Sequence, residues 1–241
     1  NPRWWPAIKA DPLLVFRVWE GGMASHGGIL GLAIFTFYYA KKHQVSWAGL
    51  ADGLCVVGPL GVFFGRMANF INGELYGRVT DVAWAVKFPD SLKLESIETQ
   101  SAAWQACTRI EPSLANASES ITPLIAAART NSELSKTLGE YLQPRHPSQI
   151  YEGLLEGLLL FLILYGVRVK FPKAANGLLT GLFFALYAIF RIIGEQFREP
   201  DAEMVGFLTR GQFLSLFMFL FAAAFLGHAW HEWRKTLRVE S

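Results

Sequence analysis

Five long runs of apolar residues divide this chain, and charged side chains are rare inside them. Each run approaches the ~20 residues that a helix needs to cross the hydrocarbon core of a bilayer. The pattern therefore predicts an all-α fold, a polytopic transmembrane helix bundle. Its expected spans are 24–40, 49–66, 151–167, 177–194 and 211–230.

Basic residues follow three of these runs and predict the orientation of the spans. Lys41 and Lys42 follow the first run, Arg168 to Lys173 the third, and Arg234 to Arg238 the fifth. Alternating spans place all three clusters on one side, and short basic loops favour the cytoplasm. The long 67–150 segment and the 195–210 loop are then expected outside.

The segment between the second and third runs is the longest stretch without an apolar run. Residues 89–143 are rich in Ser, Ala, Thr and Glu, which predicts a solvated periplasmic insertion or cap. Within it, 132–142 predicts a short amphipathic helix. The expected organisation is a transmembrane core, formed by 1–88 and 144–241, that carries this insertion.

Composition supports a membrane protein and narrows the other classes. The chain is 52% hydrophobic and 17% charged, against about 25% charged in average soluble proteins. The net charge of +2 gives no indication of a nucleic-acid partner, and none is expected. No Cys/His cluster has metal spacing and no Gly-rich nucleotide loop occurs, so neither metal nor cofactor is expected.

Two arginines stand where a charge is costly. Arg66 ends the second run and Arg191 lies inside the fourth. A charge at membrane depth costs at least ~2.5 kcal/mol and usually marks a pathway or a site. The pair suggests an anion held within the membrane. The simpler alternatives are that Arg66 extends to the outer interface and that Arg191 belongs to a structural ion pair between helices.

Polar residues gather around both arginines. In 65–81, the spacing of Arg66, Asn69 and Gly73 predicts one shared helix face, and glycines allow the backbone to approach a ligand. A second set begins in the fourth run, where steps of four, four and three predict one helix face for Tyr187, Arg191, Glu195 and Arg198. The candidate substrate-binding residues are Arg66, Asn69, Asn72, Glu74, Gly77, Tyr187, Glu195 and Arg198.

Three further ionisable groups have open roles. His26 is flanked by small residues at the outer start of the first run, and a histidine accepts protons near neutral pH. Glu152 and Glu156 form an i,i+4 pair in the third run. They, and Asp52 in the second run, either bond between helices, pair with the arginines or serve the site.

Together these residues suggest chemistry on a lipid phosphate. Arg66 and Arg191 would form a clamp that strengthens as negative charge grows on a departing phosphate, and His26 could activate a nucleophile. These residues favour a transferase that works at the outer leaflet. A lipid or organic-anion transporter is the alternative, although the repeats typical of transporters are not evident. A purely structural subunit leaves the paired arginines unexplained.

Four blocks of sequence carry a resemblance to a known family. They are FRVWEGGMASHGGILG (16–31), GRMANFINGELYGRVTD (65–81), RHPSQIYEGLLEG (145–157) and YAIFRIIGEQFREPD (187–201). In this order they resemble the prolipoprotein diacylglyceryl transferases. The resemblance implies a seven-span enzyme of the bacterial inner membrane whose active site faces the periplasmic leaflet. Such an enzyme moves the diacylglyceryl group of phosphatidylglycerol to the lipobox cysteine thiol in the signal peptide of a preprolipoprotein. A thioether and glycerol phosphate result, as the first step of lipoprotein maturation.

The resemblance also assigns roles. His26 matches the essential histidine of the family, often proposed as the thiol base, and Arg66 and Arg191 match its two phosphate-binding arginines. Other site positions match Asn69, Glu74, Gly77, Tyr187, Glu195 and Arg198. Two upstream spans of the family, the first with a functional tyrosine, are absent from this chain, which begins at Asn1. We therefore expect a fragment, and activity of the full-length protein need not be present in it.

Overall fold

The computed structural model describes residues 9, 25–116, 121–199 and 210–240. Throughout these residues the chain forms helices and loops, joined only by isolated β-bridges. The predicted all-α class is confirmed. The chain divides into two compact units, Asn1–Ala51 and Asp52–Ser241. In the first, α2 (Ser25–His43) is linked to the start of α3 (Trp47–Asn72) by a hydrogen bond of 3.2 Å from Trp47 Nε1 to Thr36 Oγ1.

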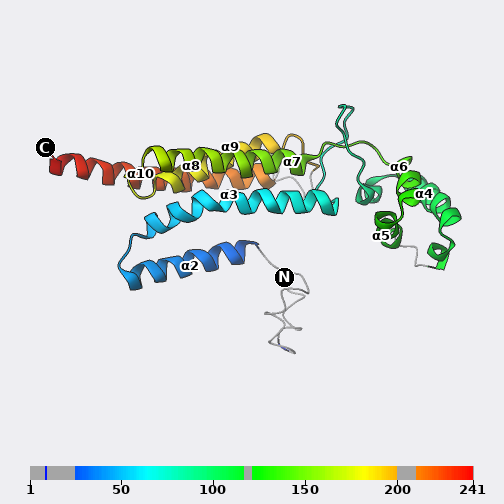
Figure 1. Cartoon of the computed structure of the whole chain (residues 1–241), viewed down its shortest axis with the longest axis horizontal. Coiled ribbons are helices and arrows are strands. Elements are labelled where there is room, and N and C mark those ends of the chain that lie inside the picture. The colour runs from blue at the N-terminus through cyan, green and yellow to red at the C-terminus, as the bar shows by residue number, and fades with distance from the viewer. Residues whose placement is uncertain (1–8, 10–24, 117–120, 200–209, 241) are drawn as a thin grey trace. The chain divides into compact units, whose positions relative to one another are not determined.

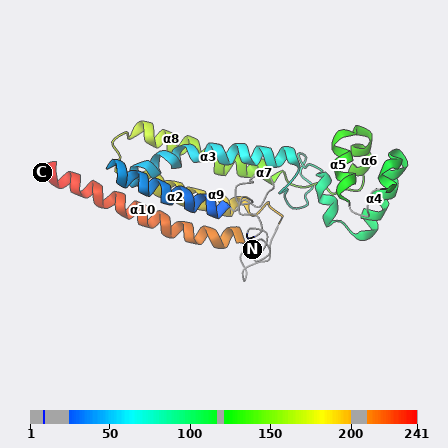
Figure 2. The same cartoon turned by 90° about the horizontal axis from the view of Figure 1, so that it is seen from below.

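The second unit contains a bundle of long helices. Beside α3 runs one continuous helical rod over Ser148–Lys170, whose middle part is a π-helix. Figures 1 and 2 show α3, this rod, α9 and α10 side by side. The rod consists of α7 (Ser148–Glu152), the π-helix η6 (Gly153–Leu159) and α8 (Leu160–Lys170), and it is followed by α9 (Leu178–Gly194) and α10 (Arg210–Glu240).

Helices occupy all five positions where the apolar runs predicted spans. Among the described residues, three helices are long and apolar enough to cross a membrane: Trp47–Asn72, Ser148–Lys170 and Gly211–Leu237. The apolar helix α9 has 17 residues, or about 25 Å of rise, which is short of a ~30 Å core. α2 coincides with the first predicted span but is not among these helices, so the count of five remains a prediction.

Glycines allow the rod to approach α3 closely. A β-carbon added at Gly157 would lie 2.6 Å from the Cβ of Phe63, and one at Gly153 would lie 2.8 Å from the Cε of Met67. Two glycines four residues apart form the small-residue stripe that lets membrane helices pack backbone to backbone. This contact brings Arg66, one turn beyond Phe63, to the start of the rod.

A buried carboxylate ties α3 to the beginning of α9. Asp52 Oδ2 accepts a hydrogen bond of 2.8 Å from the Gly177 backbone N–H. Its Oδ1 accepts bonds of 2.8 and 2.7 Å from the backbone N–H and the hydroxyl of Thr180. The carboxylate thus satisfies N–H groups that a helix N-terminus leaves unpaired, and its charge is favoured there. Of the roles left open for Asp52, the structure supports bonding between helices.

We expect Asp52→Ala to lower the free energy of unfolding by about 3 kcal/mol, because three buried donors lose a charged acceptor. The measurement is the thermal unfolding midpoint in detergent. Asp81→Ala, which removes an exposed carboxylate, is the matched control and should change the midpoint little. Equal midpoints for both variants would show that Asp52 is not an anchor.

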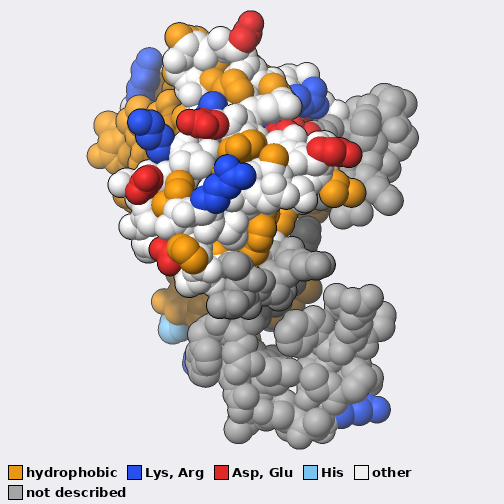
Figure 3. All heavy atoms as spheres, turned by 90° about the vertical axis from the view of Figure 1, so that its right-hand side faces the viewer, with side chains coloured by type: hydrophobic (Ala, Val, Ile, Leu, Met, Phe, Trp, Pro, Cys, Tyr) orange, Lys and Arg blue, Asp and Glu red, His pale blue; other side chains and the backbone are white. Residues whose placement is uncertain are grey.

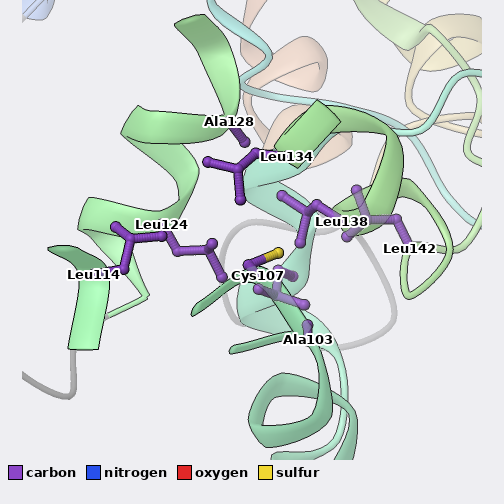
Figure 4. Close-up of a cluster of buried hydrophobic side chains, with 9 residues drawn as sticks. Ala103, Cys107, Leu114, Leu124, Ala128, Leu134, Leu138 and Leu142 are labelled. Atoms are coloured by element: carbon purple, nitrogen blue, oxygen red, sulfur yellow. The ribbon is translucent and has the colours of Figure 1, made fainter. Parts of the chain in front are cut away.

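The short helices of 89–143 enclose a hydrophobic core of their own. These elements are η4 (Pro89–Leu94), α4 (Ile97–Ile110), η5 (Pro112–Asn116), α5 (Thr122–Thr130) and α6 (Ser132–Gly139). The core side chains, most of them labelled in Figure 4, are Leu92, Ala103, Cys107, Leu114, Leu124, Ala128, Leu134, Leu138 and Leu142.

The surface of this segment is mixed. Figure 3, viewed from the side where α4 to α6 lie in Figure 1, shows acidic and basic side chains interspersed with small apolar groups, as on a water-exposed surface. The amphipathic helix predicted over 132–142 is confirmed as α6, which buries Leu134 and Leu138 and ends at Gly139.

Candidate functional site

Two buried glutamates form the centre of the site. Glu152 ends α7 and Glu156 lies one turn later in the π-helix, and the side chains of both are fully buried. A buried carboxylate is costly unless cations or hydrogen-bond donors surround it. The sequence left the role of this pair open, and the structure shows that both glutamates pair with the arginines.

Arg66 reaches this pair from α3. Its Nη1 lies 3.0 Å from Glu152 Oε2, and its Nη2 lies 3.4 Å from Glu156 Oε2. The apolar run ends at Arg66, but the helix continues to Asn72. The arginine therefore projects from within a helix toward the neighbouring rod. The structure does not show Arg66 extending to the interface. Its side chain is only 16% exposed and points to the glutamates.

Arg191 reaches the same pair from α9. Its Nη1 lies 3.1 Å from Glu152 Oε1 and 3.5 Å from Glu156 Oε1, while its Nη2 lies 2.9 Å from Glu195 Oε2. Gly211 at the start of α10 packs against the Arg191–Glu195 ion pair, because a β-carbon at this glycine would lie 2.6 Å from Glu195 Oε2. Two arginines 125 positions apart in the sequence thus share one pair of carboxylates.

Arg198 joins the cluster by a route that the spacing did not predict. α9 ends at Gly194, so Arg198 does not continue the helical face of Tyr187 and Arg191; that expectation is wrong. The chain instead turns back and forms a β-bridge between Gly77 and Arg198. This return places Arg198 Nη1 3.4 Å from Glu152 Oε1. The turn after α9, and not a continuation of the helix, thus brings Arg198 to the site.

The resulting arginine–glutamate cluster is balanced in charge. It comprises three guanidinium groups and three carboxylates: Arg66, Arg191, Arg198, Glu152, Glu156 and Glu195. Such pairing lowers the cost of holding charges in a low-dielectric region. Each guanidinium carries five N–H donors, and for Arg66 and Arg191 these outnumber the carboxylate contacts. The cluster can therefore hold its arginines in place and still present donors to an anion.

Two neighbours shape the cluster. Tyr187 lies one turn before Arg191 in α9 and is close enough to Glu156 for the two groups to interact electrostatically. Gly194 leaves room for the glutamates, since a β-carbon there would lie 3.3 Å from the Cγ of Glu152. Tyr187, Glu195 and Arg198 are thus brought together with both predicted arginines.

The other polar residues of 65–81 form a separate constellation. Glu74 Oε1 accepts hydrogen bonds of 3.0 and 3.2 Å from the side-chain amides of Asn69 and Asn72. Among the described residues, the partners of this exposed carboxylate are therefore amides. Gly73 lies outside the helix that was predicted to include it. It follows the end of α3 with φ of +70°, a backbone conformation that glycine adopts readily.

Gly77 is a point of close backbone contact. A β-carbon there would lie 2.4 Å from the carbonyl oxygen of Phe197 and 2.6 Å from that of His146. The need for glycine is thus explained by packing between loops, whereas the sequence suggested approach to a ligand. Beside it, the buried Arg145 donates to the Gly77 carbonyl at 3.2 Å and pairs with Glu199 at 2.7 Å. The contact holds together the loop that carries Arg198.

His26 belongs to the first turn of α2, in the other compact unit. Its side chain lies outside what the structure describes, so its role remains a prediction. Glu152 and Glu156 are the residues that the list of site candidates lacked. The signal for them was present: two carboxylates one turn apart in an otherwise apolar run require partners.

Comparisons with known proteins agree with these positions. The sequence profile of the family described as prolipoprotein diacylglyceryl transferase matches residues 5–228. Among relatives named phosphatidylglycerol–prolipoprotein diacylglyceryl transferase, that of Serratia proteamaculans is 38% identical over 216 residues, covering 88% of this chain and 64% of the relative. That of Vibrio cholerae is 39% identical over 210 residues, covering 86% and 59%. That of Wigglesworthia glossinidia brevipalpis is 38% identical over 219 residues, covering 89% and 67%.

The chain therefore spans about two thirds of the length of these relatives, or somewhat less. The matched region contains the arginine–glutamate cluster and the Asn69–Asn72–Glu74 constellation. With a profile match over most of its length and relatives above 30% identity, this chain belongs to the prolipoprotein diacylglyceryl transferase family.

Proposed function

We propose that the protein containing this chain transfers the diacylglyceryl group of phosphatidylglycerol to the cysteine thiol of a preprolipoprotein lipobox. The products are a thioether and glycerol phosphate. Family membership supports the reaction class, and the names of the relatives give both substrates for those proteins. The observation that carries the proposal is that two arginines from different helices, Arg66 and Arg191, meet at one buried glutamate pair.

The reaction would exchange one bond for another at a glycerol carbon. The thiolate sulfur attacks the carbon that bears the phosphate ester, a C–S bond forms, and the C–O bond breaks. The electron pair of the broken bond stays on the departing glycerol phosphate, whose charge rises from one toward two. Guanidinium groups aimed at that phosphate would stabilise the transition state more than the bound lipid.

The arginine–glutamate cluster suits this task because its cations are held before the substrate arrives. Arg66 and Arg191 would contact the phosphate, while Glu152 and Glu156 fix their guanidinium planes. Tyr187, Glu195 and Arg198 would complete the anion site. Asn69, Asn72 and Glu74, with Gly77 behind them, would bind polar parts of the substrates. Fixed donors avoid the cost of reorganising around a new charge.

The thiol proton requires an acceptor, and we assign His26 to removing it or to orienting the substrate. The same proposal places the protein in the inner membrane of a bacterium, with the site toward the periplasm. Three apolar helices of spanning length and the one-sided basic clusters support this orientation. Residues 89–143 would then be a periplasmic insertion, for which their buried core and charged surface are suited.

A vesicle assay with the full-length protein tests the reaction. Phosphatidylglycerol labelled in its headgroup glycerol is supplied with a peptide that contains a lipobox cysteine. We expect one labelled glycerol phosphate for each peptide that gains a thioether-linked diacylglyceryl group. A peptide with serine in place of the cysteine should give neither product. Movement of phospholipid between leaflets without either product would instead indicate the transporter alternative.

A further inference from the structure

A cavity lies at the opposite end of the rod from the glutamate pair. It encloses about 760 Å³, within the range of small-molecule pockets. Lys170, which lines it, follows Glu152 by 18 residues, or about 27 Å of helix. The cavity is therefore distinct from the arginine–glutamate cluster. Its lining residues come from the end of α8, the α8–α9 loop, the first residue of α9 and α10; those used below are Lys170, Phe171, Lys173, Ala175, Trp230 and Trp233.

The charged side chains that line this cavity are cationic. Lys170 and Lys173 both belong to its wall. A third cation lies next to it, because the guanidinium of Arg234 stacks over the Trp230 ring at 4.8 Å. The nearby described carboxylates have partners: Glu232 pairs with Lys235 at 2.8 Å, and Asp52 accepts from Gly177 and Thr180. The electrostatic character of the cavity mouth therefore favours an anion.

The rest of the wall is apolar and aromatic. Trp230 and Trp233 lie with ring centroids 5.1 Å apart, and each is about half exposed. Lys170 Nζ lies 5.6 Å from the centroid of the Phe171 ring. Tryptophan beside lysine and arginine at the end of an apolar helix is typical of the membrane–water boundary. An amphipathic molecule would match the cavity, with its apolar part inside and its anionic part at the lysines.

We propose that this cavity binds one anionic phospholipid of the leaflet on the basic side of the membrane. Its phosphate would lie at Lys170 and Lys173, and an acyl chain would enter between the loop and Trp230. Lipid phosphates are recognised by basic pockets between membrane helices on this side. The site goes beyond the transfer reaction, because it lies on the other leaflet and contains none of the residues assigned to that reaction.

The test uses photoactivatable phosphatidylserine and phosphatidylcholine that carry the same diazirine-labelled acyl chain. The full-length protein is reconstituted in phosphatidylcholine vesicles with a trace of either probe, illuminated, digested and mapped by mass spectrometry. No acceptor peptide is present, so the result does not depend on the transfer reaction. We expect peptides covering 170–178 and 226–233 to gain roughly tenfold more label from phosphatidylserine.

Three variants sharpen the result. The double variant Lys170→Ala/Lys173→Ala should remove the preference for phosphatidylserine. The double variant Lys41→Ala/Lys42→Ala, which deletes two exposed cations of the same predicted basic side that do not line the cavity, should keep it. Ala175→Phe, which occupies cavity space, should reduce label from both probes. Equal labelling by the two lipids, or equal loss in both double variants, would overturn the proposal in favour of diffuse attraction.

Discussion

The variant Glu152→Ala is expected to lose about 3–5 kcal/mol of unfolding free energy, the largest stability effect of any single change in this chain. Glu152 lies within 3.4 Å of guanidinium nitrogens from Arg66, Arg191 and Arg198. Without it, three buried or half-buried cations face one another with too few counter-charges. Removing one partner of a buried ion pair costs far more than the intact pair contributes.

Thermal and denaturant unfolding in detergent measure this effect. Glu152→Gln keeps the volume and an oxygen acceptor but removes the charge, so it should fall between Ala and the unaltered protein. Glu133→Ala, at an exposed glutamate of α6, controls for loss of a carboxylate and should change stability by less than about 0.5 kcal/mol. If Glu152→Ala has the same unfolding free energy as the Glu133→Ala control, Glu152 does not balance the charges of the arginines.

Arg191→Ala should lower the rate of transfer by about a thousandfold, the largest effect that we expect on the reaction. The guanidinium of Arg191 contacts Glu152, Glu156 and Glu195 at once, which fixes its plane. A fixed planar cation beside the phosphate is worth most when the second negative charge develops. Arg191→Lys keeps the charge but loses the fork of donors, so we expect it to recover only part of the rate.

The vesicle assay described above measures both variants, by glycerol phosphate released and by thioether formed. The unfolding midpoint of each variant is measured in parallel, because Arg191→Ala also leaves three carboxylates with less compensation. A comparison between the folded Lys and Ala variants separates geometry from charge. Release of glycerol phosphate by folded Arg191→Ala at the unaltered rate would exclude Arg191 from the phosphate clamp.

The helical fold could be predicted because each apolar run is long enough to form a helix by itself. The apolar runs did not predict where the helices end. α3 continues six residues beyond Arg66 to Asn72, since nothing in GRMANFIN stops a helix before Gly73. The sequence also did not predict that 89–143 has a hydrophobic core of its own. Its leucines are spread over several short helices and come together only in three dimensions.

The site could be predicted in part for the same reason. Arg66 and Arg191 stand out in sequence because a charge in an apolar run is costly, whatever the fold. Glu152 and Glu156 could not be assigned as their shared counter-ions, because Glu152 becomes central only when the rod packs against both α3 and α9. Arg198 was named for the wrong reason: spacing suggested a helix, whereas a turn after Gly194 brings it back.

The π-helix within the rod has a consequence for how the two halves of this element are constrained. Gly153–Leu159 contains Glu156 and joins Glu152 to the apolar helix α8. Changing this segment by one residue would rotate one half about the helix axis by about 100° relative to the other. Deleting one of residues 157–159 would turn Glu152 and Glu156 away from the arginines while the side chains of α8 kept their places. Insertions and deletions, more than substitutions, should therefore be the changes that this segment tolerates least.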